Sequence, residues 1–179
     1  VLYMGVDNPL EISIPGYTSD KISVNSPSEV PISLVSGKSY TSKPKRPGIY
    51  KIRVASRDGK SSGEVEFRVK PIPDPVGFCG GKKTGAIPVN LLKSQSGIYA
   101  QAEGFDFNVK FQIKGFEMVY APKRGNIVTS ATTGNKFNAE MQTMLSRLKP
   151  GDRLIIDNIR VQKPDGTTTT ISISYRTTS

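Results

Sequence analysis

The sequence predicts an all-β protein of two tandem immunoglobulin-like β-sandwich domains, the second of which carries one short α-helix. Three observations lead to this prediction: short runs of alternating apolar and polar residues, frequent turn formers, and a proline-rich stretch between two strand-rich regions. The 179 residues include 17 Gly and 13 Pro, and 36% are hydrophobic. Alternation with a period of two places apolar side chains on one face of a strand, and Gly and Pro form the turns between strands.

The first domain, residues 1–72, is predicted from two long strands joined by the Asp58-Gly59 turn. One strand covers residues 49–55 and the other ends near Lys70. Their apolar faces are formed by Tyr50, Ile52 and Val54 in the first strand and by Val65, Phe67 and Val69 in the second. Shorter strands are predicted at residues 10–14, 22–24, 30–35 and 38–42. Together these strands suit a sandwich with one buried and one solvated face per sheet.

A proline-rich linker separates the two domains. Pro71, Pro73 and Pro75 stand at every second position, where each fixes φ and removes a backbone donor, so we expect an extended, semi-rigid connector. Residues 1–72 carry 11 basic and 7 acidic side chains, and residues 73–179 carry 14 and 8. Neither part is therefore a basic tail.

The second domain, residues 73–179, is predicted around a strand at residues 105–113. Strict alternation over these nine residues puts five large apolar side chains on one face, so we expect this strand to organise the second core. Asp106 and Asn108 fall on its other face and are expected to meet solvent. Further strands are predicted at residues 116–121 and 127–130, and a final hairpin joins residues 154–161 to 167–175 across a Pro-Asp-Gly turn.

One helix interrupts the β pattern at about residues 138–148. Asn138 can cap it, Glu140 lies in its positive first turn, and the apolar residues from Met141 to Leu148 share one face. Pro150-Gly151 ends it. A single helical turn is also expected at residues 88–93.

The residue inventory favours a protein without catalytic chemistry. The chain has no His and one cysteine, Cys79, so histidine bases, zinc sites and an internal disulfide are excluded. Asp152, Asp157 and Asp165 could form a carboxylate cluster, but two of them follow turn formers and none has the spacing of a calcium loop. We therefore expect no enzyme activity, no catalytic residue, no cofactor and no metal.

Three basic clusters lie in predicted loops, and the net charge is +10. They comprise Lys43, Lys45 and Arg46, then Lys82 and Lys83, then Lys123 and Arg124. Gly80–Gly85 lacks the spacing of a phosphate-binding loop, and the clusters lack the interleaved aromatic residues of a nucleic-acid surface. Solvated loops and an acidic protein partner remain as alternatives. Lys82, Lys83, Lys123 and Arg124 are the candidate partner-binding residues.

No targeting signal is visible in the sequence. There is no run of about 18 apolar residues and no lipidation motif. Because the chain begins at Val1 in a strand-like segment, we expect it to be part of a longer protein with its membrane or targeting segment upstream. We expect no membrane contact by these residues.

Particular segments resemble the C-terminal part of the GldM/PorM family. They are Val1–Leu10 (VLYMGVDNPL), Phe67–Pro75 (FRVKPIPDP), Gly134–Phe137 (GNKF) and Leu148–Asp152 (LKPGD). The first two are the most specific, and the resemblance runs through essentially the whole chain. Phe78-Cys79-Gly80 departs from the small or polar residues expected there, which leaves the role of Cys79 open.

The resemblance implies a homodimeric periplasmic shaft of the type IX secretion and gliding machinery. In that family an N-terminal helix anchors the protein in the inner membrane beside GldL/PorL, and the distal end meets a ring of the GldK/PorK lipoprotein and GldN/PorN. The shaft would carry proton-motive energy to secretion or gliding, without nucleic acid. The alternative is a stand-alone β-sandwich that binds a ligand or glycan, which predicts a monomer with an aromatic-lined groove.

Overall fold

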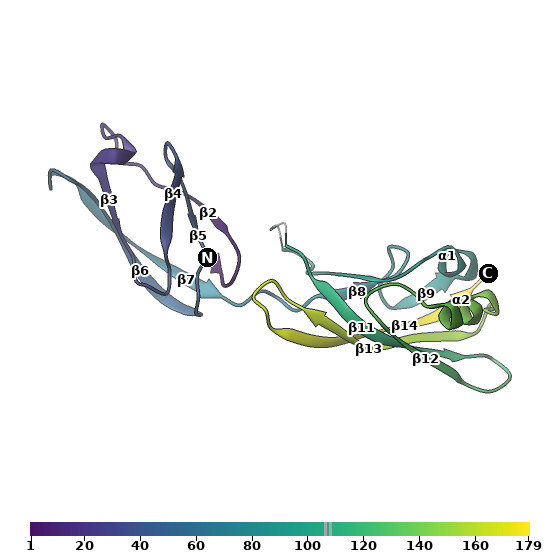
Figure 1. The fold of residues 1–179 in the computed structure, drawn as a ribbon. Helices are drawn as coiled ribbons and strands as arrows, with labels where there is room; N and C mark the ends of the chain where they lie inside the picture. Colours follow the sequence, from purple (N-terminus) through teal and green to yellow (C-terminus); the bar gives the residue numbers. More distant parts are fainter. Residues whose placement is uncertain (106, 108) are drawn as a thin grey trace. The chain divides into compact units, whose positions relative to one another are not determined.

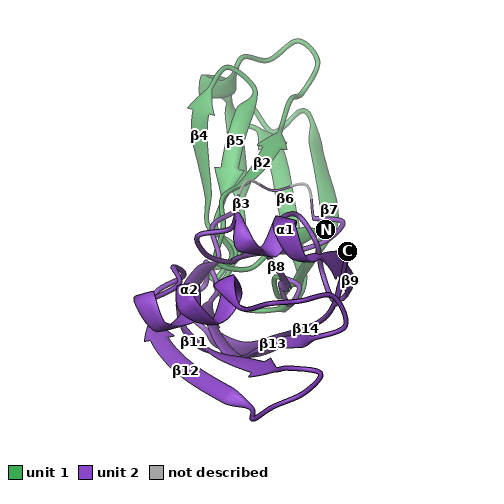
Figure 2. Cartoon of the chain, turned by 90° about the vertical axis from the view of Figure 1, so that its right-hand side faces the viewer, with its two compact units in different colours: residues 1–72 green, residues 73–179 purple. Residues whose placement is uncertain are grey.

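The computed structural model of the chain describes residues 1–105, 107 and 109–179. By its internal contacts the chain divides into two compact units, Val1–Ile72 and Pro73–Ser179 (Figure 2). Strands dominate both units (Figure 1), which confirms the all-β, immunoglobulin-like fold class. The predictions for Asp106 and Asn108 lie outside the described residues.

Unit 1 contains two sheets that face each other. The four-stranded sheet has the order β1-β7-β6-β3, and the three-stranded sheet has the order β2-β5-β4. The strands are β1 (Leu2–Tyr3), β2 (Asn8–Glu11), β3 (Ile22–Asn25), β4 (Ile32–Ser36), β5 (Ser39–Ser42), β6 (Gly48–Ser56) and β7 (Ser62–Lys70), with a 3-10 helix at Ser19–Lys21. The strand predicted at residues 10–14 instead begins at Asn8 and ends at Glu11.

The core of unit 1 is small because only one half of β7 is covered. Ile52 and Val69 are each 2% exposed and pack with Leu2 and Val30. Val65 shares its face with Val69 but is 51% exposed, so its predicted burial is wrong. The β7 strand carries more apolar surface than the opposing sheet covers.

Unit 2 contains a five-stranded sheet with the order β12-β11-β13-β14-β9 and a two-stranded sheet of β10 and β8. Its strands are β8 (Val76–Phe78), β9 (Gly85–Pro88), β10 (Tyr99–Gln101), β11 (Gln112–Ala121), β12 (Val128–Thr133), β13 (Arg153–Gln162) and β14 (Thr168–Thr178). The helices are α1 (Val89–Lys93) and α2 (Ala139–Ser146). Figure 2 shows both helices and β8 on the same face of the larger sheet.

A single large core fills the space between that sheet and the helices. Phe116 and Met118 of β11 and Ile156 of β13 are fully buried, and Met141 of α2 packs into the same cluster. The ring of Phe116 meets that of Phe137 edge to face, with centroids 6.0 Å apart. Alternation along β11 and β13, adjusted by bulges, directs these apolar side chains to one face.

The two predicted helical segments are confirmed. The Asn138 side chain accepts a hydrogen bond of 2.8 Å from the Met141 amide, and Glu140 lies in the first turn of α2. The helix ends at Ser146, before Pro150. The single turn expected at residues 88–93 is α1, which begins at Val89.

The strand predicted at residues 105–113 is wrong for most of its length. Regular strand β11 begins at Gln112. Before it, the rings of Phe105 and Phe107 stack with centroids 5.0 Å apart, and the Val109 amide donates to the Phe107 carbonyl at 2.9 Å. Residues 109–111 are described and lie outside any strand. The second core is therefore organised by β11 and β13.

Candidate functional site

The candidate site is a groove of about 670 Å³ on unit 2, formed by two loops. One loop, residues 122–127, joins β11 to β12, and the other, residues 147–152, joins α2 to β13. The residues that line it are Tyr120, Pro122, Lys123, Arg124, Asn126, Val128, Arg147, Lys149, Pro150 and Asp152. Four of these carry a positive charge, so we call this surface the basic groove.

One buried carboxylate joins the two loops. Asp152 is 4% exposed. Its Oδ1 accepts a hydrogen bond of 2.8 Å from the Lys123 amide, and its Oδ2 accepts one of 2.9 Å from the Lys149 amide and one of 2.7 Å from the Tyr120 hydroxyl. The predicted turn residue therefore fixes the spacing of the two basic loops.

The C-terminal strand holds the second loop from the other side. The Thr177 hydroxyl donates to the Lys149 carbonyl at 2.7 Å, and the Gly151 amide donates to the Thr177 carbonyl at 2.9 Å. Gly151 has a φ of 93°, and the Lys123 side chain passes directly over it. This backbone conformation and this close approach both favour glycine.

The hydrogen bonds of Asp152 decide its charge. Burial raises the pKa of its carboxyl, but the Lys123 amide, the Tyr120 hydroxyl and the Lys149 amide together lower that pKa below its ordinary value. Burial, assisted by the hydrogen bond to Asp152, raises the pKa of Tyr120 to about 12. At neutral pH the pair is a carboxylate that accepts from a neutral phenol.

The cations of the basic groove form no ion pair with an acidic side chain among the described residues. In the described part of the chain, the ion pairs join other residues, and none includes Lys123, Arg124, Arg147 or Lys149. Asp152 is the only acidic side chain among the residues that line the groove. Its carboxylate is already bound by the amides of the loops. The groove therefore presents excess positive charge to solvent.

The second predicted basic pair lies elsewhere on unit 2. Lys82 and Lys83 come just before β9, at the opposite edge of the five-stranded sheet from the β11–β12 hairpin. The Lys82 carbonyl accepts a 2.5 Å hydrogen bond from the Tyr175 hydroxyl, and Lys83 pairs with Glu103 at 2.7 Å. The structure thus does not bring the two predicted partner-binding pairs together.

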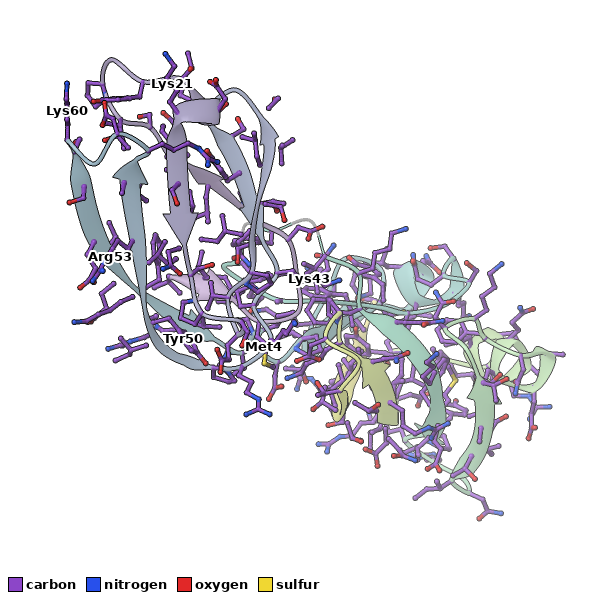
Figure 3. The ribbon with its side chains drawn as sticks, turned by 60° about the vertical axis from the view of Figure 1, so that its left-hand side comes forward. Met4, Lys21, Lys43, Tyr50, Arg53 and Lys60 are labelled. Carbon is purple, nitrogen blue, oxygen red and sulfur yellow. The ribbon has the colours of Figure 1, made fainter. Side chains whose placement is uncertain are left out.

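The remaining predicted residues lie in loops. Lys43, Lys45 and Arg46 belong to the β5–β6 loop of unit 1, and Figure 3 shows Lys43 there. Pro71 and Pro73 are exposed and Pro75 is buried, in a stretch between β7 and β8 without helix or strand. Asp165 accepts from the Thr167 amide in the last hairpin turn. No group of three or more potential metal-binding side chains occurs among the described residues.

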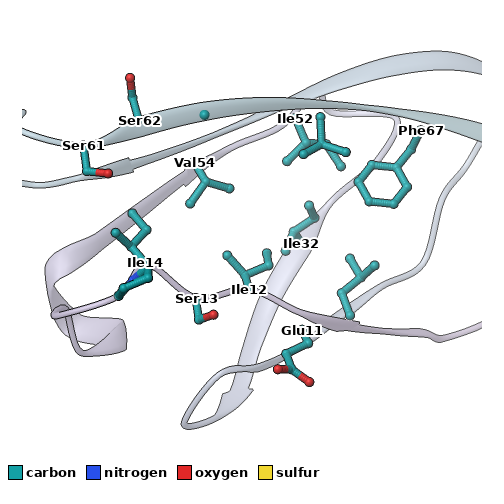
Figure 4. Close-up of a pocket in the computed structure, with 14 residues that line it drawn as sticks. Glu11, Ile12, Ser13, Ile14, Ile32, Ile52, Val54, Ser61, Ser62 and Phe67 are labelled. Atoms are coloured by element: carbon teal, nitrogen blue, oxygen red, sulfur yellow. The ribbon is translucent and has the colours of Figure 1, made fainter.

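Unit 1 has a separate apolar groove of about 360 Å³. In Figure 4, Ile52, Val54 and Phe67 point from β6 and β7 toward Ile12 and Ile32. Its outer rim is formed by β7, which β1 covers only at Val69 and Lys70. Residues 62–68 of β7 therefore form an edge of the four-stranded sheet, which explains the exposure of Val65.

Cys79 is fully buried in the core of unit 2. Burial raises the pKa of its thiol to about 12, so the thiol is protonated at neutral pH. Its Sγ lies 3.7 Å from the Gly97 carbonyl oxygen.

In the part of the chain that the structure describes, no helix has the length and apolar composition to cross a membrane.

Sequence reasoning identified Lys123 and Arg124 but missed Arg147 and Lys149, which face the same groove. The residue that joins the two loops is Asp152, which the sequence analysis interpreted only as a turn residue. A buried aspartate after Pro-Gly that binds a second loop leaves no periodic signal. The nearest sequence signal was the short spacing of Arg147, Lys149 and Asp152 after a predicted helix.

Comparisons with known proteins cover both units. Residues 1–70 match the family model described as the GldM third domain, and residues 73–178 match the GldM C-terminal domain. No curated protein matches the chain. Among solved structures, the chain is similar to Yersinia pseudotuberculosis InvD at 13% identity and a TM-score of 0.25, over 86% of this chain and 56% of that one. The chain spans little more than half of that structure.

Proposed function

The chain belongs to the GldM family, and from that premise we propose that it is a force-transmitting part of the periplasmic shaft of the type IX secretion and gliding machinery. GldM domains are structural components of that machinery, in the periplasmic part of a complex anchored in the inner membrane. In our proposal this segment links the energising complex in the inner membrane to the outer-membrane-associated ring. It transmits proton-motive energy by contact and by stiffness.

The observation that carries the proposal is the tandem match of two consecutive GldM domains. The first match ends at residue 70 and the second begins at residue 73, so only Pro71 and Ile72 lie between them, and Pro73 and Pro75 open the second match. Pro71, Pro73 and Pro75 restrict the backbone of this junction. A short, restricted junction between two β-rich units transmits force better than a flexible tether.

The proposed partners follow the family. We propose a homodimer that binds GldL/PorL through an upstream segment with an anchoring helix, and the ring of GldK/PorK and GldN/PorN through unit 2. The uncovered edge of β7, residues 62–68, supports pairing with a second copy, because an open strand edge offers unpaired backbone groups. Light scattering of the chain tests the dimer, and a monomer at high concentration would contradict it.

The residues support a role without catalysis. The chain has no His, and its one thiol, on Cys79, is buried and protonated. The rival glycan-binding module predicts an aromatic-lined groove. Phe67 is the only aromatic residue among those that line the apolar groove of unit 1, and Tyr120 the only one in the basic groove. Neither of these two grooves is lined mainly by aromatic residues; a smaller pocket of unit 2, about 270 Å³ in volume, is lined by Phe105, Phe107 and Phe111 and is where the rival would place its ligand.

The test separates stiffness from contact in the full-length protein in its host. Replacing the exposed Pro71 and Pro73 together by serine should reduce secretion while co-purification of GldK/PorK and GldN/PorN persists. Pro15→Ser with Pro47→Ser, in exposed loops of unit 1, is the control and should leave secretion unchanged. Normal secretion by the linker variant would contradict force transmission through this junction.

A further inference from the structure

We propose that the basic groove of unit 2 binds an acidic, extended segment of a protein partner. The inference deepens the contact role described above and rests on it only in requiring a protein partner. It begins from the arrangement of charge. Lys123 and Arg124 lie on one wall of the groove, and Arg147 and Lys149 lie on the other. An anionic chain between the walls would meet cations on both sides.

The groove is held in a form suited to this partner before binding. Asp152 accepts hydrogen bonds from both walls, so its carboxylate fixes the loops and does not extend toward solvent. The Tyr120 hydroxyl, 2.7 Å from Oδ2, blocks the same carboxylate from the side of the core. Preorganisation of this kind lowers the entropic cost of binding.

The other lining residues favour a peptide over a nucleic acid. Pro122, Val128 and Pro150 add apolar surface between the cations, and Ile127 of the same hairpin is 65% exposed. A peptide can match this mixture by alternating carboxylate and apolar side chains. A single-stranded nucleic acid is bound through aromatic rings that stack on its bases, whereas the only aromatic residue lining the groove, Tyr120, is 7% exposed.

A membrane surface fits less well than a peptide. Apart from Ile127, Tyr99 is the only large hydrophobic residue of unit 2 that is exposed among the described residues, and it belongs to β10. One aliphatic side chain gives little insertion into a bilayer. The volume of about 670 Å³ instead suits side chains of an extended segment lying between two loops.

The experiment measures the binding of the 179-residue chain to a fluorescein-labelled peptide of alternating glutamate and valine, by fluorescence anisotropy. The variants Lys123→Glu with Arg124→Glu, and Arg147→Glu with Lys149→Glu, should each weaken binding about tenfold or more. Lys21→Glu with Lys60→Glu changes the net charge equally at one end of unit 1 (Figure 3) and should change affinity less than about twofold. Glutamine variants of the four groove residues remove the positive charge without adding a negative one. Circular dichroism checks that they are folded.

Equal weakening by all three double variants would show non-specific attraction to a basic protein and overturn the proposal, as would binding that ignores both groove variants. Oligothymidylate and phosphatidylglycerol vesicles are tested in parallel. If either depends on the groove residues more steeply than the peptide does, the partner is not a protein segment. Peptide binding needs no assembled machinery, so its failure leaves the linker experiment on secretion unaffected.

Discussion

The backbone amide of Lys123 donates a hydrogen bond of 2.8 Å to Oδ1 of Asp152, across the groove between two loops of unit 2. The other carboxylate oxygen accepts from the Lys149 amide, in the second loop, at 2.9 Å. One side chain therefore sets the distance between two pairs of cations. The stability of unit 2 and the affinity of its groove should depend on the same residue.

Replacing Asp152 by asparagine should lower the free energy of unfolding by about 2 kcal/mol, because an amide cannot accept on both sides and leaves a buried donor unsatisfied. Urea unfolding followed by circular dichroism measures the loss. The control is Asp157→Asn on β13, where the side chain is exposed, and it should change stability by less than about 0.5 kcal/mol. Equal losses in the two variants would mean that the carboxylate of Asp152 has no special role.

The native chain and the Asp152→Asn variant should also differ in how their stability depends on pH. The pKa of Asp152 in the folded protein lies below its ordinary value of 3.8. A lowered folded pKa stabilises the protein above the unfolded value, and this stabilisation is lost as pH falls through the folded value. The difference in urea midpoint between the native chain and Asp152→Asn should therefore be constant near neutral pH and shrink below about pH 4. A difference that persists unchanged to about pH 2 would contradict the lowered pKa.

The sequence predicted what local chemistry decides. The Asn138 cap, the Pro-Asp-Gly hairpin turn and the alternation along β6 each depend on residues close together in the chain, and all three are present in the structure. The strand predicted at residues 105–113 failed because alternation does not distinguish a sheet face from aromatic rings that stack on each other. The Phe105–Phe107 stack satisfies the same pattern outside any sheet.

The candidate site was predictable only in part, for a related reason. Lys123 and Arg124 are visible as a basic pair beside a turn. Their association with Arg147 and Lys149 depends on Asp152, whose hydrogen bonds join loops that are far apart in the sequence. A single sequence carries no periodic signal for such a contact. Burial of Val65 was likewise misjudged, because it depends on how much of β7 the opposing sheet covers.

Cys79 should resist alkylation while unit 2 is folded. Its side chain is fully buried, and burial raises its pKa to about 12, so little thiolate exists near neutral pH. Iodoacetamide should leave the native chain unmodified and label it fully in urea, as measured by intact mass spectrometry. Rapid labelling of the native chain would show that the core opens locally around β8.

Two truncations should show the uneven burial in unit 1. Ile52→Ala removes a side chain that is 2% exposed and should cost about 3 kcal/mol, whereas Val65→Ala, at a position that is 51% exposed, should cost less than about 1 kcal/mol. Both residues line the apolar groove. Urea unfolding of each variant gives the comparison. Equal destabilisation by Val65→Ala and Ile52→Ala would contradict the uneven burial in unit 1.

Gly151→Ala should damage the basic groove more than a matched glycine substitution elsewhere. Gly151 has a φ of 93°, and a Cβ there would lie 3.2 Å from Cδ of Lys123. Gly166 has a φ of 87° but nothing within 4 Å of its Cβ position. Both substitutions pay the backbone cost of about 1 kcal/mol for a left-handed alanine, and only Gly151→Ala also displaces Lys123.

The two costs can be separated by measuring stability and peptide affinity on both variants. Gly166→Ala should lower stability and leave binding of the glutamate-valine peptide unchanged. Gly151→Ala should lower stability by more and also weaken binding of the peptide, because the Lys123 side chain lies over that glycine on the wall of the groove. Unchanged peptide affinity in Gly151→Ala would show that the position of the Lys123 side chain is not set by Gly151, and that its charge reaches an acidic partner from any rotamer.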